Sequence, residues 1–246
     1  MIDYNSAPWL SSYGDRKFNL EYPKASISDT VLNTADEVPS FVALSYMGVK
    51  TNYKTFKAKI LETAAAFTAL GVRPGDKVTV CLPNVPQAVY SLYALNYIGA
   101  IASMIHPLSA EGEIVFYIKT VGSRFCITLD QFVKKFDEVF EKTDLEKLIV
   151  TGPEDELGFV KKSAYRLFIR KKELKSIKTE GRYILWKDFV AAGRGAEVKP
   201  AHNEATEPAV ILFSGGTTGV TKGIMLSNLN FNALAYQTAE MAHYPV

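Results

Sequence analysis

Apolar runs of strand length alternate with helix-length segments between residues 55 and 151, and this alternation limits the folds open to the chain. We expect helices at 55–70, 86–97, 109–121 and 131–141, and strands at 77–82, 100–105, 125–128 and 147–151. Strands separated by single helices form βαβ units, whose right-handed crossovers leave the strands parallel. The sequence therefore predicts an α/β fold in which helices flank a mainly parallel sheet.

The segments on either side of this alternation are less regular. Residues 1–25 form an arm without a clear period, and Ser28-Asp29 and Thr55 are the expected N-caps of the first two helices. The remaining expected elements are strands at 41–46, 50–53 and 183–186, a helical turn at 187–192 and a polar linker at 193–208. The linker predicts two parts, an N-terminal α/β subdomain over residues 1–205 and the start of a second subdomain over residues 206–246.

The stretch EPAVILFSGGTTGVTKGIMLS, residues 207–227, places a polar loop between two short apolar strands, with a helix at 228–241 behind the cap Ser227-Asn228. The loop combines glycines, whose N–H groups can form an anion-binding concavity, with hydroxyl donors and one ammonium. These groups come from Ser214, Gly215, Gly216, Thr217, Thr218, Gly219, Thr221, Lys222 and Gly223. We predict that the loop binds a phosphate chain; the alternative is a surface turn that binds nothing.

Two commoner phosphate loops do not fit this stretch. The Walker A pattern places a lysine directly after a glycine and a helix directly after that. Here two residues separate Gly219 from Lys222, and a strand is expected to follow. The dinucleotide fingerprint G-x-G-x-x-G is absent from the stretch.

The segment SGGTTGVTKGIMLS closely resembles the phosphate-loop signature of the adenylate-forming, AMP-binding enzymes, and its doubled glycine resembles the fatty-acyl-CoA synthetase branch. LGVRPGDKVTVCLPNVPQAV and IGAIASMIHPLSAEGEI match earlier segments of that family in order and spacing. Thr221 replaces a proline common in the family, and Gly215 replaces a serine or threonine. His106 stands where many relatives have asparagine, and we expect it to be a turn histidine satisfied by hydrogen bonds.

The resemblance implies a two-step reaction, in which a carboxylate and ATP give an acyl-adenylate and pyrophosphate, and coenzyme A then displaces AMP. Mg²⁺ would neutralise phosphate charge. Side chains of Ser214, Thr217, Thr218 and Lys222, with the backbone of Gly215, Gly216 and Gly219, would hold the β- and γ-phosphates of ATP. The implied partners are thus ATP, a long- or medium-chain fatty acid and coenzyme A.

The family's later motifs, which carry its catalytic residues, do not occur in the 246 residues. We therefore expect the N-terminal part of the family's large domain, incomplete at its C-terminus and inactive alone, with catalytic residues beyond residue 246. Two alternatives stay open: a non-catalytic nucleotide- or phosphate-binding module, and an adenylation domain that serves an aryl acid or a carrier protein.

The composition limits the kinds of partner and the cellular compartment that we expect for this chain. A net charge of +2 does not indicate nucleic-acid binding, and no metal-ligand spacing occurs. Cys81 and Cys126 lie in apolar runs, which predicts two buried, reduced thiols and a cytoplasmic protein, and we expect neither a signal peptide nor a membrane span at 88–105. Residues 161–178 hold eight basic residues and one acidic residue. They form either a solvated connector or a peripheral membrane contact. Apolar surface on an incomplete sheet would also allow self-association.

Overall fold

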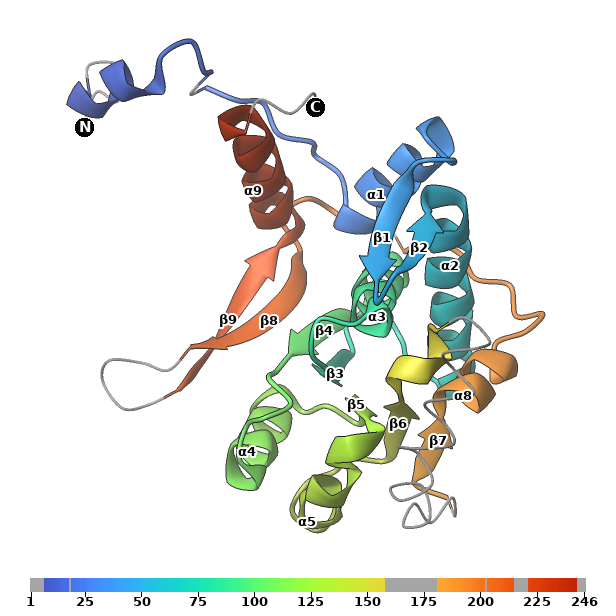
Figure 1. The fold of residues 1–246 in the computed structure, drawn as a ribbon. Helices are drawn as coiled ribbons and strands as arrows, with labels where there is room; N and C mark the ends of the chain where they lie inside the picture. Colours follow the sequence, from blue (N-terminus) through green and yellow to red (C-terminus); the bar gives the residue numbers. More distant parts are fainter. Residues whose placement is uncertain (1–6, 18, 158–180, 202, 215–220, 243–246) are drawn as a thin grey trace.

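The apolar runs of the sequence become the strands of one sheet in the computed structural model, which describes residues 7–17, 19–157, 181–201, 203–214 and 221–242 (Figure 1). The sheet has seven strands in the order β7-β6-β5-β3-β4-β8-β9. These are β3 (Lys77–Cys81), β4 (Ile101–Met104), β5 (Phe125–Leu129), β6 (Lys147–Thr151), β7 (Tyr183–Leu185), β8 (Pro208–Ser214) and β9 (Lys222–Ser227). All neighbouring pairs are parallel except β8–β9. This confirms the predicted α/β fold with a mainly parallel sheet.

Helices cover both faces of the sheet (Figure 1). The described helices are α1 (Ile27–Glu37), α2 (Tyr53–Leu70), α3 (Pro86–Tyr97), α4 (Glu111–Val121), α5 (Phe136–Lys142), α8 (Trp186–Ala192) and α9 (Asn228–Met241), with 3₁₀ turns η2 (Pro8–Tyr13), η3 (Asp130–Lys135) and η4 (Pro153–Asp155). One apolar core joins the sheet to α2, α3 and α8, and a second joins its other face to α4 and α5. The sheet is therefore the middle of three layers.

The central strands β3, β4 and β5 are mainly apolar and mostly buried because both of their faces are covered. Along β5, Phe125 and Ile127 pack in the core with α2 and α3, whereas Cys126 between them packs in the core with α4 and α5. Cys81 and Cys126 are both free and buried, as predicted. Burial raises the pKa of Cys81 to about 12.

A separate hairpin, β1 (Val42–Tyr46) and β2 (Val49–Asn52), leads into α2. Met47 and Gly48 turn it with φ of 49° and 81°, the positive values that a tight hairpin of this twist requires. The N-cap of α2 is Asn52, whose Oδ1 accepts from the Thr55 amide at 2.9 Å, so the expected cap at Thr55 was wrong.

Other expected boundaries moved by a few residues. The cap of α1 is Ser26 rather than Ser28-Asp29, because the Ser26 hydroxyl accepts from the Asp29 amide at 3.0 Å. The helix expected from Ser109 begins at Glu111, and the helix expected at 131–141 is split into η3 and α5. The predicted division between residues 205 and 206 stays a prediction, although β8 pairs directly with β4 in the same sheet.

Candidate phosphate site at the β8–β9 hairpin

The β8–β9 hairpin holds both ends of the predicted loop. The strands pair antiparallel, with Phe213 opposite Gly223 and Ser214 opposite Lys222. The structure thus confirms the strand–loop–strand arrangement and places Ser214 and Lys222 together at the loop end of the hairpin. Gly215, Gly216, Thr217, Thr218 and Gly219, the other predicted site residues, lie outside the described residues, as do His202, His243 and the basic segment 161–178.

The loop end of the hairpin lies at the carboxyl edge of the sheet. Because β8 runs parallel to β4, the chain leaves both strands at that edge. The strand order reverses around β3, since β4 lies on one side of it and β5 on the other. In open α/β sheets, the crevice at such a reversal, outside the carboxyl ends of the strands, is where ligands bind. The predicted phosphate loop therefore starts from the edge where this fold places ligands.

Lys222 brings a positive charge to this edge. Its side chain is exposed, and no ion pair joins it to an Asp or Glu among the described residues. Ser214, opposite it, is half-buried. A hydroxyl and an ammonium at facing register positions can bind a phosphate from two sides.

An aromatic stack supports the hairpin from beneath. The ring of Phe213 stacks on the ring of Tyr117 of α4, with centroids 4.2 Å apart and planes 29° apart. On β9, a Cβ atom placed on Gly223 would lie 3.4 Å from Phe213 Cε1. Phe213 therefore contacts both α4 and the strand that carries Lys222.

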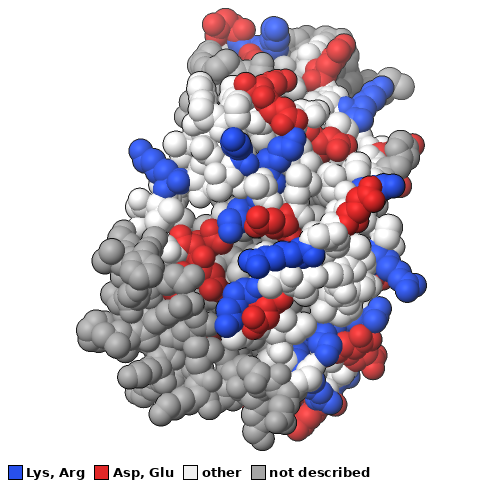
Figure 2. All heavy atoms as spheres, turned by 90° about the vertical axis from the view of Figure 1, so that its right-hand side faces the viewer, with Lys and Arg blue, Asp and Glu red and all other residues white. Residues whose placement is uncertain are grey.

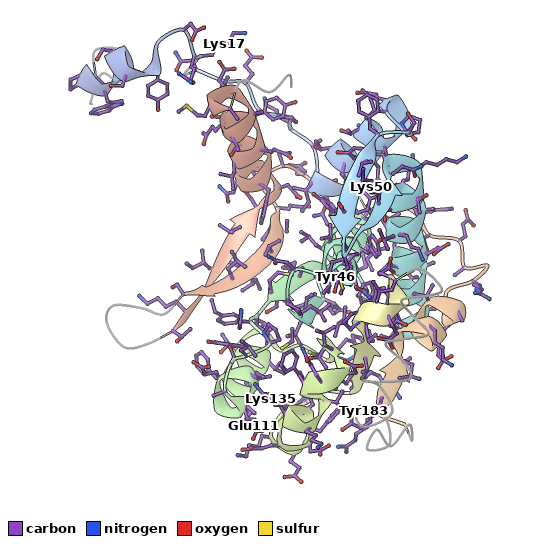
Figure 3. All side chains as sticks on the ribbon, viewed as in Figure 1. Lys17, Tyr46, Lys50, Glu111, Lys135 and Tyr183 are labelled. Carbon is purple, nitrogen blue, oxygen red and sulfur yellow. The ribbon has the colours of Figure 1, made fainter. Side chains whose placement is uncertain are left out.

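The neighbouring loop, which leaves β4, is tied down separately. Lys135 of η3 donates from Nζ to the carbonyl oxygens of Ser109 at 2.9 Å and Pro107 at 3.3 Å. Figure 3 places Lys135 beside Glu111, the first residue of α4. His106 in this loop accepts from the Leu108 amide at Nδ1, 3.2 Å, which confirms it as a turn histidine.

A hydrogen-bonded pair of asparagines, whose contact the sequence did not predict, fixes the junction of β9 and α9. Asn228 is 1% exposed; its Oδ1 accepts from the Ile27 amide at 3.1 Å and from Asn96 Nδ2 at 2.9 Å, and its Nδ2 donates to the Glu204 carbonyl at 3.0 Å. Asn96 Oδ1 in turn accepts from the Ser28 amide at 3.0 Å. The available signal was an asparagine inside the apolar run at 88–105, because a buried amide needs polar partners.

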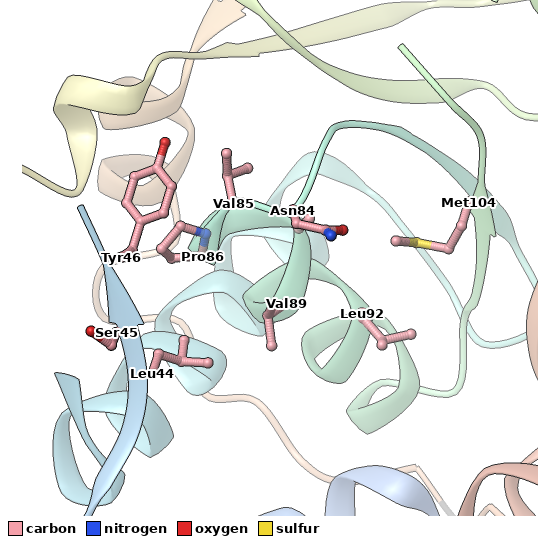
Figure 4. A pocket seen from close by; sticks show the side chains of 10 residues that line it. Leu44, Ser45, Tyr46, Asn84, Val85, Pro86, Val89, Leu92 and Met104 are labelled. Carbon is pink, nitrogen blue, oxygen red and sulfur yellow. The ribbon is translucent and has the colours of Figure 1, made fainter. Parts of the chain in front are cut away.

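One cavity among the described residues is lined by neither Ser214 nor Lys222. It has a volume of about 240 Å³ and lies between β1, the start of α3 and Met104 (Figure 4). Its lining is Leu44, Ser45, Tyr46, Asn84, Val85, Pro86, Ala88, Val89, Leu92 and Met104, with no charged side chain. It therefore lacks the charge that a phosphate site needs.

The described surface carries both signs of charge. Figure 2 shows acidic and basic side chains interspersed on the face it presents. Among described residues, no group of three or more His, Cys, Asp and Glu side chains is placed to hold a metal ion. None of the described helices combines the length and hydrophobicity that a membrane crossing requires. The absence of a nucleic-acid partner stays a prediction.

Comparison with known proteins shows which family this chain matches. A family model described as AMP-binding enzyme matches residues 31–246. A long-chain-fatty-acid–CoA ligase of Bacillus subtilis (strain 168) is 28% identical over 228 residues, 92% of this chain and 41% of that protein. An acetyl-coenzyme A synthetase of Streptomyces avermitilis is 28% identical over 231 residues, 91% of this chain and 33% of that protein. The chain thus spans about two-fifths or less of the length of these curated relatives.

Solved structures share the fold at low sequence identity. The anthranilate CoA ligase AuaEII, in complex with anthranoyl-AMP, matches 85% of this chain and 36% of its own with a TM-score of 0.66 at 19% identity. A long-chain-fatty-acid-CoA ligase from Archaeoglobus fulgidus matches 92% of this chain and 42% of its own with a TM-score of 0.63 at 24% identity. At such identities the likeness concerns the fold alone.

Proposed function

Because the chain belongs to the AMP-binding enzyme family, we propose that it is the N-terminal portion of an ATP-dependent acyl-CoA synthetase. In the proposed reaction, a fatty-acid carboxylate attacks the α-phosphate of ATP, which forms an acyl-adenylate and releases pyrophosphate. The thiol of coenzyme A then attacks the acyl carbon and releases AMP. The observation that supports the proposal is the hairpin, in which Ser214 lies opposite Lys222 at the carboxyl edge of the sheet.

The part proposed for the hairpin is positioning and charge stabilisation. The Lys222 ammonium and the Ser214 hydroxyl would hold the β- and γ-phosphates together with the loop residues Gly215, Gly216, Thr217, Thr218 and Gly219. Charge that develops on the leaving pyrophosphate would then meet donors already in place. An exposed lysine that pairs with no carboxylate in the described part of the chain suits this role, because no ion pair with those residues has to break before phosphate binds.

Mg²⁺ would enter with the nucleotide. Residues 208–227 contain no Asp or Glu, so the hairpin has no carboxylate to offer the ion. Mg²⁺ in such sites is commonly bound through substrate phosphates and water, where it neutralises phosphate charge. The proposed role of the hairpin is therefore to bind the phosphates, while the phosphates and water coordinate the ion.

The proposed acid is a long- or medium-chain fatty acid. Long-chain-fatty-acid–CoA ligases and acetyl-coenzyme A synthetases both occur among the relatives, so the family match by itself does not choose between them. The doubled glycine Gly215-Gly216 before Thr217 resembles the fatty-acyl branch and supports the longer acid. Pyrophosphate exchange in the enzyme that carries this chain, compared for palmitate, acetate and benzoate, tests the proposal. Exchange stimulated only by benzoate would favour the alternative of an aryl-acid adenylation domain.

Replacing Lys222 tests the site. In the enzyme that carries this chain, Lys222→Ala should lower ATP–pyrophosphate exchange about a hundredfold or more, since removing one preorganised donor typically costs that much. Lys199→Ala is the matched control, because Lys199 is also exposed and pairs with Glu197 at 3.7 Å, away from the hairpin. Equal exchange in the two variants would remove Lys222 from the site.

A second candidate function is a non-catalytic nucleotide- or phosphate-binding module. It predicts that the 246-residue chain binds ATP with Mg²⁺ measurably in calorimetry, whereas the synthetase proposal predicts weak or no binding and no exchange by this chain alone. Fatty-acid-dependent exchange by the isolated chain would contradict its proposed inactivity.

We further propose a cytoplasmic location, which the two free, buried cysteines support. Membrane contact through residues 161–178 and self-association through exposed apolar residues stay predictions. Co-sedimentation with anionic liposomes, with and without Arg170, Lys171 and Lys172, tests the first. Sedimentation equilibrium tests the second.

A further inference from the structure

The hairpin that holds the predicted loop has support on one side only. β9 is the last strand of the described sheet and is hydrogen-bonded to β8 alone. Its residues Lys222–Met225 are exposed. An edge strand of this kind opens locally more readily than a central strand. The register between Ser214 and Lys222 therefore depends on the contacts made near the loop end of the hairpin.

Phe213 makes the contacts that reach across this end. Its ring stacks on Tyr117 at 4.2 Å, and its edge covers the backbone of Gly223, where a Cβ would lie 3.4 Å from Phe213 Cε1 and 3.4 Å from Ile211 Cγ2. An aromatic ring that covers a cross-strand glycine helps fix strand register. Phe213 directly precedes Ser214, and Gly223 directly follows Lys222, so one ring braces both phosphate-binding positions.

The platform under this ring is fixed independently of the hairpin. Tyr117 is half-buried on α4, whose start is held by Lys135 through the carbonyls of Pro107 and Ser109. The Glu113 carboxylate also accepts from the Ala110 amide at 2.9 Å, which closes the first turn of α4. Tyr117 therefore lies on a helix whose start is held by hydrogen bonds that do not involve the hairpin.

We propose that Tyr117 and Phe213 are positioning residues that hold Ser214 and Lys222 opposite each other for phosphate binding. The consequence for ATP rests on the proposed function. The consequence for the hairpin does not, because it concerns contacts between described residues only. The two parts can therefore be tested separately.

Hydrogen exchange on the 246-residue chain tests the hairpin. Tyr117→Leu removes the stacking ring, and Tyr117→Phe keeps it as the matched control. Amides of residues 213–214 and 222–224 should exchange about three- to tenfold faster in Tyr117→Leu, the range that corresponds to the usual energy of an aromatic pair. Exchange in β5 should not change in either variant. Equal exchange at the hairpin in both variants would overturn the proposal.

Kinetics of the enzyme that carries this chain tests the consequence for ATP. Tyr117→Leu should raise the KM for ATP several-fold with a smaller change in kcat, and Tyr117→Phe should match the unchanged enzyme. Suppose that Tyr117→Leu speeds hydrogen exchange at the hairpin but leaves the KM for ATP unchanged, in an enzyme that Lys222→Ala impairs. The stack would then have only a structural role, and the positioning role would be overturned. If the unchanged enzyme shows no ATP–pyrophosphate exchange at all, the proposed function fails. The hydrogen-exchange result would still show whether the Tyr117–Phe213 stack holds the hairpin.

Discussion

The centre and the edge of the sheet differ in how far they bury their apolar residues. On β5, at the centre, every residue is buried, and Ile127 is 0% exposed between the two helical layers. On β9, at the edge, Ile224 and Met225 are 45% and 66% exposed. Both strands contain a run of apolar residues, Ile224–Leu226 in β9 and Phe125–Ile127 in β5, so the presence of such a run does not separate them.

This difference shows that stability and the candidate site draw on separate parts of one sheet. Helices on both faces bury the centre, and burial of apolar surface is the main source of folding free energy. At the edge, β9 pairs with β8 alone among the described strands, and the specific contacts nearby are the Phe213 stack and the Asn228 hydrogen bonds at the junction with α9. Substitutions at the two places should therefore have effects of different size and kind.

The largest expected effect comes from shortening an isoleucine at the centre. Ile127→Ala should lower the free energy of unfolding by about 3–4 kcal/mol, because it removes buried methyl groups and leaves a cavity. Ile224→Ala is the matched substitution at the edge and should cost less than about 1 kcal/mol, because Ile224 is already partly in water. Urea denaturation measures both. Equal losses would break the comparison, since the edge would then be as well packed as the centre.

An intermediate effect is expected at the junction that carries the hairpin. Asn228→Ala should lower the free energy of unfolding by about 2–3 kcal/mol, because it leaves the Ile27 amide and Asn96 Nδ2 buried without an acceptor. Asn230→Ala is the control, since Asn230 is exposed and its Oδ1 only accepts from the Ser227 amide and hydroxyl. Its cost should be about 0.5–1 kcal/mol, as for other end-of-helix hydrogen bonds. A cost at Asn228 no larger than at Asn230 would show that the asparagine pair does not anchor α9.

The smallest effect concerns alkaline pH and the central thiols. Burial raises the pKa of Cys81 from its ordinary 9.0 to about 12, so the folded thiol stays protonated while the unfolded thiol ionises. Its contribution is complete below pH 9.0 and is lost as pH rises toward 12. Between pH 8 and 10, the free energy of unfolding should fall by about 1 kcal/mol less in Cys81→Ala than in the unchanged chain. Parallel pH profiles in the two proteins would show that Cys81 ionises equally in both states.

Much of the fold could be predicted because its signals are local. Pro86 and Ser227 each mark a helix start, and α3 and α9 have the predicted bounds. The caps of α1 and α2 were missed because several Ser, Thr and Asn residues lie within one turn of each start. Backbone conformation, which the sequence pattern does not specify, decides which of them accepts the hydrogen bond.

The candidate site could be predicted only as a segment. The strand–loop–strand pattern around Ser214 and Lys222 is local and is confirmed. The place of β8 next to β4, the contact of Tyr117 with Phe213 and the pairing of Asn96 with Asn228 join segments about a hundred residues apart. Contacts at such separations arise from packing and leave no periodic trace in the sequence.

The hydrogen bond from the Ile27 amide to Asn228 spans 201 residues, and Ala25 and Tyr22 likewise bond Asn232 and Gln237 on α9. On a ribosome that adds about 5–20 residues per second, the first partner waits roughly 10–40 s for the second to be made. During that interval the arm has no α9 to lie on, while β3 to β6 can already assemble. Residues 22–27 are thus among the last of the described residues to reach their final position.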